Sequence, residues 1–351
     1  MSDLRPEIAP ARAVTETIRW KVGKVIDAHV HFRGVEPVPH FYRILDIVGY
    51  DKVCILGGTA EGGPALERKA DQSARFYAFG RLQHDRDKAR RGDGAYLVGQ
   101  VEQMRALGYD GLKMLEGKPS LRGGTATAQD WAPWTLDHRY YAPLWEALEA
   151  LDRPVTLHVA DPVDWWNSAD PAVAIYRTEA PQESFFQEAI AVLERHPRLR
   201  INFAHFLFMG PQLDRMGDLL SRFPGMRVDM AMGDEFLYYL SDDPERARDF
   251  FIRWQDRILY GTDISDRNSL RHAWAKAATL RRFLETGDAF VNPTQEALGQ
   301  PPQRGSNGRL ELRGLDLPPE VLGRVLALNF EAFAGANPML LPRSPGCSEA
   351  E

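Results

Sequence analysis

Two histidines, His29 and His31, stand two residues apart at the end of the apolar segment VIDAHVHF, residues 25–32. Successive side chains of a β-strand point to opposite faces, so residues two apart share a face, and Asp27 has the same spacing. Two neutral imidazoles on one face can bind a single divalent cation such as Zn²⁺. An HxH pair alone is a weak indication, because core histidines also occur in such pairs, so other segments must supply further ligands.

Three more polar residues end apolar segments further along the chain. His158 closes PVTLH, His205 closes INFAH and Asp263 closes RILYGTD. If these segments are parallel strands of one barrel, their carboxyl ends meet at one face, where catalytic residues collect. Four histidines and one aspartate would then converge on a single site. The remaining histidines fall in helix or loop context, where we expect ordinary structural roles: His40, His84, His138, His196 and His272.

The elements that must position these residues are short apolar runs that alternate with longer stretches of helical spacing. We predict strands over residues 25–32, 50–58, 74–83, 109–117, 153–161, 200–206, 226–231 and 257–265. Helical spacing is found over residues 94–108, 140–152, 182–197 and 244–254. Strict alternation predicts an α/β protein with parallel strands, and eight strands close a (β/α)₈ TIM barrel. A doubly wound open sheet is disfavoured, because no glycine-rich phosphate loop follows the first strand.

Composition narrows the class of protein. The 351 residues, 44% hydrophobic and 26% charged, are typical of a folded globular chain. The net charge of -6, without a dense basic run, argues against a nucleic-acid partner. The two cysteines, Cys54 and Cys347, are too far apart for a disulfide framework or a thiolate zinc site, so any metal would be bound by nitrogen and oxygen ligands. Without a signal peptide or a membrane-spanning apolar run, we expect a cytoplasmic protein with no membrane partner.

We expect one domain, with the barrel over residues 23–340, an N-terminal extension over 1–22 and a flexible C-terminal tail over 341–351. Residues 117–139 and 286–317 do not fit the alternation, and their glycine, proline and polar residues predict loops or insertions. The first of these follows the fourth strand, so it would lie on the active face of a barrel as a lid or substrate loop. A simple surface excursion is the alternative.

The order of these motifs resembles the amidohydrolase superfamily of metal-dependent barrel enzymes, with HxH on strand one, histidines on strands five and six and an aspartate on strand eight. The resemblance covers about residues 24–336. The GTD of LYGTDIS and the last helical segment, VLGRVLALNFEAFAG, resemble the amidohydrolase-2 branch. That branch includes aminocarboxymuconate-semialdehyde decarboxylase, resorcylate decarboxylase and several lactonases and hydratases. The resemblance implies an enzyme of the metal-dependent hydrolase type and leaves the substrate open.

The resemblance, joined to ligand chemistry, implies that His29, His31, His158 and Asp263 bind one divalent ion. Zn²⁺ is expected, Mn²⁺ is the alternative, and one ion is preferred over two. Such an ion lowers the pKa of a bound water or polarises a substrate carbonyl or carboxylate. Asp263 would also act as the base that takes the proton of the water. His205 would orient or protonate the reacting group, or bind a second ion in a two-metal site.

Four other residues are candidates for substrate binding. Lys113 lies on the fourth strand, where some superfamily members carry a carboxylated lysine between two metals; unmodified, it would pair with a substrate carboxylate or simply extend from the barrel edge. Arg33 directly follows the HxH pair and would bind an anion or a nearby acid. Trp165 and Trp166 would form an aromatic wall for a ring-bearing substrate, or pack their loop onto the barrel. Asp229, which ends the seventh strand, is predicted to accept a hydrogen bond from a ligand histidine.

We therefore expect a metal-dependent hydrolase that uses metal-activated water on an amide, lactone or related acyl bond of a small, acidic or ring-bearing molecule. One alternative is a metal-dependent, non-oxidative decarboxylase of an aromatic or unsaturated carboxylic acid, in which the metal and His205 assist protonation of the carbon that loses CO₂. An alternative of another class is a non-catalytic metal-binding barrel. The expected partner is a small-molecule substrate. Relatives in this branch often form homodimers, although nothing in the sequence marks an interface.

Overall fold

A curved parallel sheet forms the centre of the protein. The computed structural model describes residues 21–122, 131–177, 180–231, 234–305 and 307–342. Within these residues the strands of the sheet follow one another in chain order, and every neighbouring pair is parallel. The strands are β1 (Ile26–His31), β2 (Lys52–Leu56), β3 (Phe76–Gly80), β4 (Gly111–Gly117), β5 (Val155–Val159), β6 (Ile201–Phe203), β7 (Met226–Asp229), β8 (Ile258–Leu259) and β9 (Ile264–Ser265). The predicted order of parallel strands is therefore confirmed.

The two ends of the sheet meet and close a (β/α)₈ barrel, as the sequence predicted. β8 pairs with β7 and β9 pairs with β1, and only residues 260–263 separate β8 from β9. The backbone N–H of Ala28 donates to the carbonyl of Tyr260, and that of Asp263 donates to the carbonyl of His29, each at 2.9 Å. The eighth strand of the barrel is thus present in two short pieces, which both contact β1.

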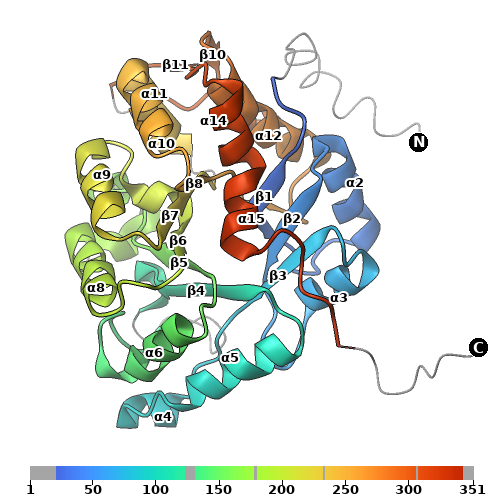
Figure 1. Cartoon of the computed structure of the whole chain (residues 1–351). Helices are drawn as coiled ribbons and strands as arrows, with labels where there is room; N and C mark the ends of the chain where they lie inside the picture. The colour runs from blue at the N-terminus through green and yellow to red at the C-terminus, as the bar shows by residue number, and fades with distance from the viewer. Residues whose placement is uncertain (1–20, 123–130, 178–179, 232–233, 306, 343–351) are drawn as a thin grey trace, which may run out of the picture.

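Helices surround the sheet, as Figure 1 shows. They are α2 (Val38–Val48), α3 (Pro64–Asp71), α4 (Arg86–Arg91), α5 (Tyr96–Ala106), α6 (Ala142–Ala150), α7 (Asp164–Asn167), α8 (Gln182–Arg195), α9 (Leu213–Arg222), α10 (Asp234–Asp242), α11 (Pro244–Arg253), α12 (Leu270–Glu285), α13 (Thr294–Ala297), α14 (Pro319–Gly323) and α15 (Asn329–Ala334). Local sequence explains several of the ends. Ser269 and Asp85 cap α12 and α4 through side-chain oxygens that accept backbone N–H groups. Gly49 ends α2 in the left-handed conformation that glycine favours.

The last helical segment closes one end of the barrel. Phe330 and Phe333 of α15 pack with a buried cluster of strand residues: Ile26, Ala28, Cys54, Leu56, Tyr77, Phe79 and Leu259. Asn329 fixes the segment, because its Nδ2 donates to the carbonyls of Ile258 and Gln255 at 2.8 and 2.6 Å. In Figure 1, α15 lies over the centre of the ring of strands, and α14 continues away from it toward α11 and α12. The carboxyl ends of the strands, which carry the polar residues, therefore lie at the opposite end of the barrel.

Left-handed backbone cuts short or interrupts two of the predicted strands. The sixth was predicted over 200–206, but β6 ends at Phe203 because His205 and the three residues after it have φ between 50° and 58°. The eighth was predicted over 257–265 and is interrupted near Asp263, whose φ is 54°. The left-handed backbone conformation is energetically unfavourable for residues other than glycine. Local sequence preferences therefore did not predict it at these positions.

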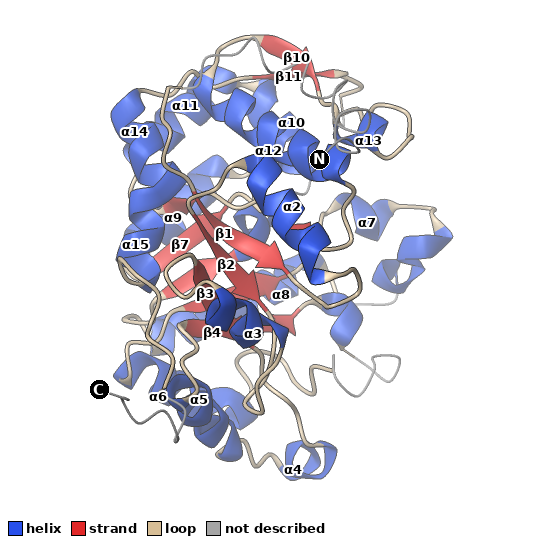
Figure 2. Cartoon of the chain, turned by 90° about the vertical axis from the view of Figure 1, so that its right-hand side faces the viewer, coloured by secondary structure: helices blue, strands red, loops and turns tan. Residues whose placement is uncertain are grey.

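The remaining predictions concern insertions and termini. Residues 286–317 hold α13 and a small antiparallel sheet of β10 (Ala289–Val291) and β11 (Glu311–Arg313), which lies apart from the barrel strands in Figure 2. Part of the predicted lid loop, residues 123–130, lies outside the described residues, as do nearly all of the predicted N-terminal extension and C-terminal tail. Within the described part of the chain, no helix combines the length and apolar character that crossing a bilayer requires.

Candidate metal centre

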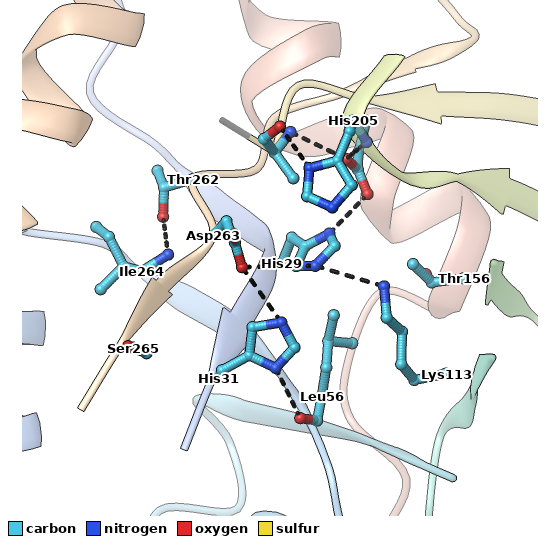
Figure 3. Close-up of polar contacts among 12 residues, drawn as sticks. His29, His31, Leu56, Lys113, Thr156, His205, Thr262, Asp263, Ile264 and Ser265 are labelled. Atoms are coloured by element: carbon cyan, nitrogen blue, oxygen red, sulfur yellow. Dashed lines mark hydrogen bonds and ion pairs between the residues drawn. The ribbon is translucent and has the colours of Figure 1, made fainter. Parts of the chain in front are cut away.

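Three side chains converge at the carboxyl ends of the strands. Ring nitrogens of His29 and His31 and a carboxylate oxygen of Asp263 lie within 4.8 Å of one another. Nε2 of His31 is 3.2 Å, and Nε2 of His29 is 3.8 Å, from the same Oδ1 of Asp263 (Figure 3). His29 is buried, whereas His31 and Asp263 are half-buried and face the mouth of the barrel. The sequence predicted that these three residues would meet.

Carbonyl groups fix the proton positions on two of the imidazoles. Nδ1 of His31 lies 3.2 Å from the carbonyl oxygen of Leu56, and Nδ1 of His205 lies 3.0 Å from that of Ala231. A carbonyl oxygen can only accept, so each Nδ1 carries a proton. When these rings are neutral, their Nε2 atoms keep a free lone pair, which is the state that binds a metal.

Asp229 holds the third imidazole, as the sequence predicted for an acid at the end of the seventh strand. Its Oδ2 lies 3.1 Å from Nδ1 of His29 and accepts from Nδ2 of Asn202 at 2.8 Å, and its Oδ1 accepts from the backbone N–H of His205 at 2.9 Å. Burial raises the pKa of Asp229, but its contacts with His29 outweigh burial and hold that pKa well below its ordinary value. The ionised carboxylate therefore orients His29 so that Nε2 points into the site.

The electrostatics of the group fit a cation. Burial and the charge of Lys113 lower the pKa of His29 to about 4, so its ring is neutral near pH 7. Burial raises the pKa of Asp263, yet the His31 contact and the charge of Lys276 bring it well below its ordinary value. Since the proton of His31 is on Nδ1, the lone pair of its Nε2 faces a carboxylate oxygen. Two such acceptors repel each other unless a proton or a cation lies between them, and nitrogen and oxygen donors of this kind suit Zn²⁺.

His158 lies beside this group but is directed elsewhere. Its ring centroid is 4.9 Å from that of His205, while its Nε2 is 3.1 Å from Oδ1 of Asp161. Asp161 is buried and is held by the hydroxyl of Tyr176, which donates to its Oδ2. Burial lowers the pKa of His158, so its ring is neutral. Because Asp161 takes Nε2, only Nδ1 remains for a metal, and the role of His158 as fourth ligand stays a prediction.

His205 stands on strained backbone. Residues 205–208 all have positive φ, at 58°, 53°, 50° and 50°, and they form a left-handed turn, Ala204–Phe208. Each residue in this region costs about 1–2 kcal/mol relative to the right-handed form. Packing offsets that cost: Phe206 stacks between Phe236 and Phe251, with centroids at 5.8 and 6.0 Å. Strain of this kind concentrates at functional sites, where neighbouring structure holds it.

Lys113 is the cation of the centre. Only 2% of the residue is exposed, and its Nζ lies 3.5 Å from Nε2 of His29. Burial lowers the pKa of Lys113 to about 8, while Asp229 and Asp263 act in the opposite direction. Figure 3 shows Lys113 and Asp263 on different sides of His29. Lys113 therefore points into the site, and the alternative of a lysine extending from the barrel edge is wrong.

The other predicted substrate contacts lie further out. Arg33 is exposed, and its backbone N–H donates to Oδ1 of Asp266 at 3.1 Å. Trp165 and Trp166 of α7 are half-buried and pack edge-on against Tyr176, with centroids at 5.2 and 4.9 Å. Nε1 of Trp166 also donates to the carbonyl of Ala180 at 2.9 Å. Both tryptophans thus support their loop, and their contact with a substrate stays a prediction.

Sequence reasoning missed a polar pair beside the centre. Nε2 of His84 lies 2.8 Å from Oε1 of Glu116, and both side chains are nearly buried. Glu116 ends a predicted strand, and His84 follows another, so the signal that found the metal ligands was present here too. In the sequence His84 falls in helix or loop context, where an ordinary structural role was expected.

Comparison with known proteins agrees with this fold. A family model described as amidohydrolase matches residues 26–329. An uncharacterized TIM-barrel protein of Bordetella bronchiseptica, Bb4693, aligns with a TM-score of 0.51 and 15% identity, over 88% of this chain and 98% of that one. The apo form of the IDCase of Metarhizium anisopliae aligns with a TM-score of 0.48 and 13% identity, over 89% and 97%. No curated protein matches the chain.

The fold and the gathered ligands define a TIM-barrel protein of the metal-dependent hydrolase type. The chain belongs to the amidohydrolase family, in the amidohydrolase-2 branch that its motifs predicted. At 15% identity, the likeness to the Bordetella protein supports the fold and carries no information on the reaction.

Proposed function

We propose that the protein is a metal-dependent hydrolase that cleaves an amide, lactone or related acyl bond in a small, acidic or ring-bearing molecule. The observation that carries this proposal is the convergence of His29, His31 and Asp263 within 4.8 Å, with the ring proton of each histidine directed toward a neighbouring acceptor. Membership of the amidohydrolase family supports hydrolysis as the reaction class.

His29, His31 and Asp263 would hold one divalent ion, with Zn²⁺ expected before Mn²⁺, and His158 would complete the set through Nδ1. When bound, such an ion supplies Lewis acidity, which acidifies water and polarises an acyl oxygen. The four imidazoles form a row in space, in the order His31, His29, His205 and His158. Neighbouring ring centroids in this row are 4.9 to 5.2 Å apart.

Three side chains of the site have separate roles in the reaction. Asp263 is ionised at neutral pH, so its carboxylate accepts the proton of the attacking water. His205 carries its proton on Nδ1, so its Nε2 accepts a hydrogen bond and orients the reacting group, while the proton that Asp263 takes from the water passes on to the leaving group. The ammonium group of Lys113 donates to the acyl oxygen and stabilises the negative charge that develops on it.

Arg33 and the two tryptophans would contact the rest of the substrate. The guanidinium group of Arg33 is exposed just after β1, at the mouth of the barrel, where it can bind an anionic group. Trp165 and Trp166 follow β5 on the same face and would line a ring-bearing substrate.

Non-oxidative decarboxylation of an aromatic or unsaturated acid is the second candidate. The buried ammonium group of Lys113, 3.5 Å from His29, favours it because a substrate carboxylate would find a cation there. His205 would then assist protonation of the carbon that loses CO₂, after its Nε2 has taken up a proton from solvent.

The test is a screen of the purified, metal-loaded protein against esters, lactones, amides and aromatic acids. Acid release without CO₂ supports hydrolysis, whereas CO₂ release from the acids supports decarboxylation. Chelation should abolish either activity and metal should restore it. A protein without activity on any of these classes, whose stability is also unaffected by chelator, would be a non-catalytic barrel.

A further inference from the structure

A small pocket opens beside the metal centre at the carboxyl ends of β3 and β4. Lys113, Leu115 and Glu116 of β4 line it together with Arg81, which directly follows β3, and with His84, Leu121 and Trp131. Lys113 belongs to both places, since its Nζ is 3.5 Å from Nε2 of His29. The centre of a water-sized group can occupy about 10 Å³ in this pocket, within a space of about 250 Å³ that is partly open to solvent. The pocket therefore accepts about one group the size of a water molecule.

Glu116 gives the pocket an unused acceptor. Its side chain is 8% exposed, and its Oε1 lies 2.8 Å from Nε2 of His84. Among the described residues, the buried Oε2 of Glu116 has no hydrogen-bond partner. A buried polar atom without a partner is rare and unfavourable, and it indicates a position where a ligand group donates a hydrogen bond.

A chain of hydrogen bonds fixes the orientation of Glu116. Nδ1 of His84 lies 3.0 Å from the hydroxyl of Tyr140, which in turn lies 2.7 Å from that of Tyr96. Arg122 holds the backbone of Glu116, because its Nη2 donates to the Glu116 carbonyl at 3.2 Å. Oε1 is therefore engaged by His84 and cannot leave without breaking this chain, so Oε2 is the oxygen that remains to accept from a ligand.

We propose that this pocket binds a hydroxyl group of the substrate, and the inference rests on the proposed function in taking the metal centre as the place of reaction. A hydroxyl group can donate a hydrogen bond to Oε2 of Glu116 and accept one from the ammonium group of Lys113. It thereby gives a partner to both groups. A carboxylate cannot donate to Oε2 of Glu116, and an ammonium group cannot accept from Lys113 or from Arg81, the second cation of the lining. Leu115, Leu121 and the ring of Trp131 supply apolar surface for the carbon skeleton that bears the hydroxyl. The substrate class is thus a hydroxylated small molecule with its reactive acyl or carboxyl group toward the metal centre.

The test measures binding of phenol, anisole, benzoate and benzylamine to the full-length, zinc-loaded protein by titration calorimetry and protein-observed NMR. Phenol should bind at least about tenfold more tightly than anisole, which cannot donate a hydrogen bond. Glu116→Met should remove this preference, because methionine keeps the shape and lacks the carboxylate. Glu102→Met, at an exposed position of α5, should leave it unchanged.

Equal affinity for phenol and anisole in the wild-type protein would overturn the proposal, and this comparison needs no variant that must fold. Tighter binding of benzoate or benzylamine than of phenol would also overturn it, as would phenol binding that persists in Glu116→Met but disappears when zinc is removed. Because no turnover is required, failure here is distinct from failure of the proposed function, which is judged by metal content and hydrolysis.

Discussion

Nε2 of His31 lies 3.2 Å from Oδ1 of Asp263, although one residue ends the first strand of the barrel and the other lies between the two pieces of the last. They meet because β9 pairs with β1 and because the N–H of Asp263 donates to the carbonyl of His29. Closure of the barrel is therefore also assembly of the metal centre. A change that opens the β1–β9 pairing should lose the site before it loses the helices around it.

Removing the carboxylate behind His29 should weaken metal binding. Asp229→Asn keeps the shape of the side chain, but an amide cannot hold Nδ1 of His29 and the backbone N–H of His205 as a carboxylate does. We expect the affinity for Zn²⁺ to fall about 10–100-fold, as is typical when such a supporting acid is lost. Competition with a fluorescent chelator measures this directly. Asp218→Asn, at an exposed position of α9, is the control, and an unchanged affinity in Asp229→Asn would contradict the role of this contact.

The role of Lys113 can be separated from that of a metal ligand. If its ammonium group stabilises charge on the substrate, Lys113→Met should lower kcat by about 10²-fold or more while the metal content per chain stays unchanged. A carboxylated lysine between two ions would instead lose metal with the substitution. Metal analysis and steady-state kinetics on the same preparation distinguish the two outcomes. Lys24→Met, at an exposed position, should change neither quantity.

Phe206 should be essential for the left-handed turn that carries His205. Phe206→Ala removes the ring that stacks on Phe236 and Phe251, so the free energy of unfolding should fall by about 3–5 kcal/mol. The turn would relax toward right-handed backbone, and His205 would leave its position. Phe283→Ala, in the buried face of α12, is a matched cavity control that should cost similar stability. Activity per folded molecule should fall only in Phe206→Ala; equal activity in both variants would argue against the turn as a positioning device.

A buried ion pair remote from the metal centre should make stability depend on pH. Nζ of Lys69 lies 2.7 Å from Oδ2 of Asp110, with both side chains fully buried. Burial raises the pKa of Asp110, and Lys69 opposes that rise. Without Lys69 the pKa of Asp110 rises further, so the folded state binds a proton that the unfolded state releases. The folded state of the protein without Lys69 therefore loses stability as the pH rises through the pKa of Asp110.

Lys69→Met should therefore destabilise the protein by about 3–5 kcal/mol at pH 8, and by clearly less at pH 5 where Asp110 can protonate. Urea unfolding at the two pH values measures the difference. Combining the change with Asp110→Asn should recover much of the loss at pH 8. A deficit of Lys69→Met that is the same at both pH values would show that packing, and not charge, accounts for it.

Much of the fold could be predicted because it depends on short-range patterns. Runs such as VIDAHVHF and RPVTLHVAD are apolar, bounded and separated by helical spacing, and each became a parallel strand. The convergence of His29, His31 and Asp263 followed from a single geometric fact, that the carboxyl ends of barrel strands share one face. Asp229 was found in the same way.

Other features of the site depend on contacts that no local pattern contains. The left-handed backbone at His205 and Asp263 is held by tertiary packing against the preference of the residues themselves. Asp161 takes Nε2 of His158 only once the loop after β5 has folded over it. His84, in the segment after β3, pairs with Glu116 of β4, and only the folded path of that segment brings the two together.

The most direct test of the account is the metal content of the purified protein and of Asp263→Asn, measured by inductively coupled plasma mass spectrometry after dialysis against metal-free buffer. The wild-type chain should retain about one divalent ion, and the variant, which lacks the charged ligand of the set, should retain far less. Chelation of the wild-type protein should abolish hydrolysis and added Zn²⁺ should restore it. Full metal occupancy in Asp263→Asn, or activity that persists in the metal-free protein, would contradict the assignment of this site.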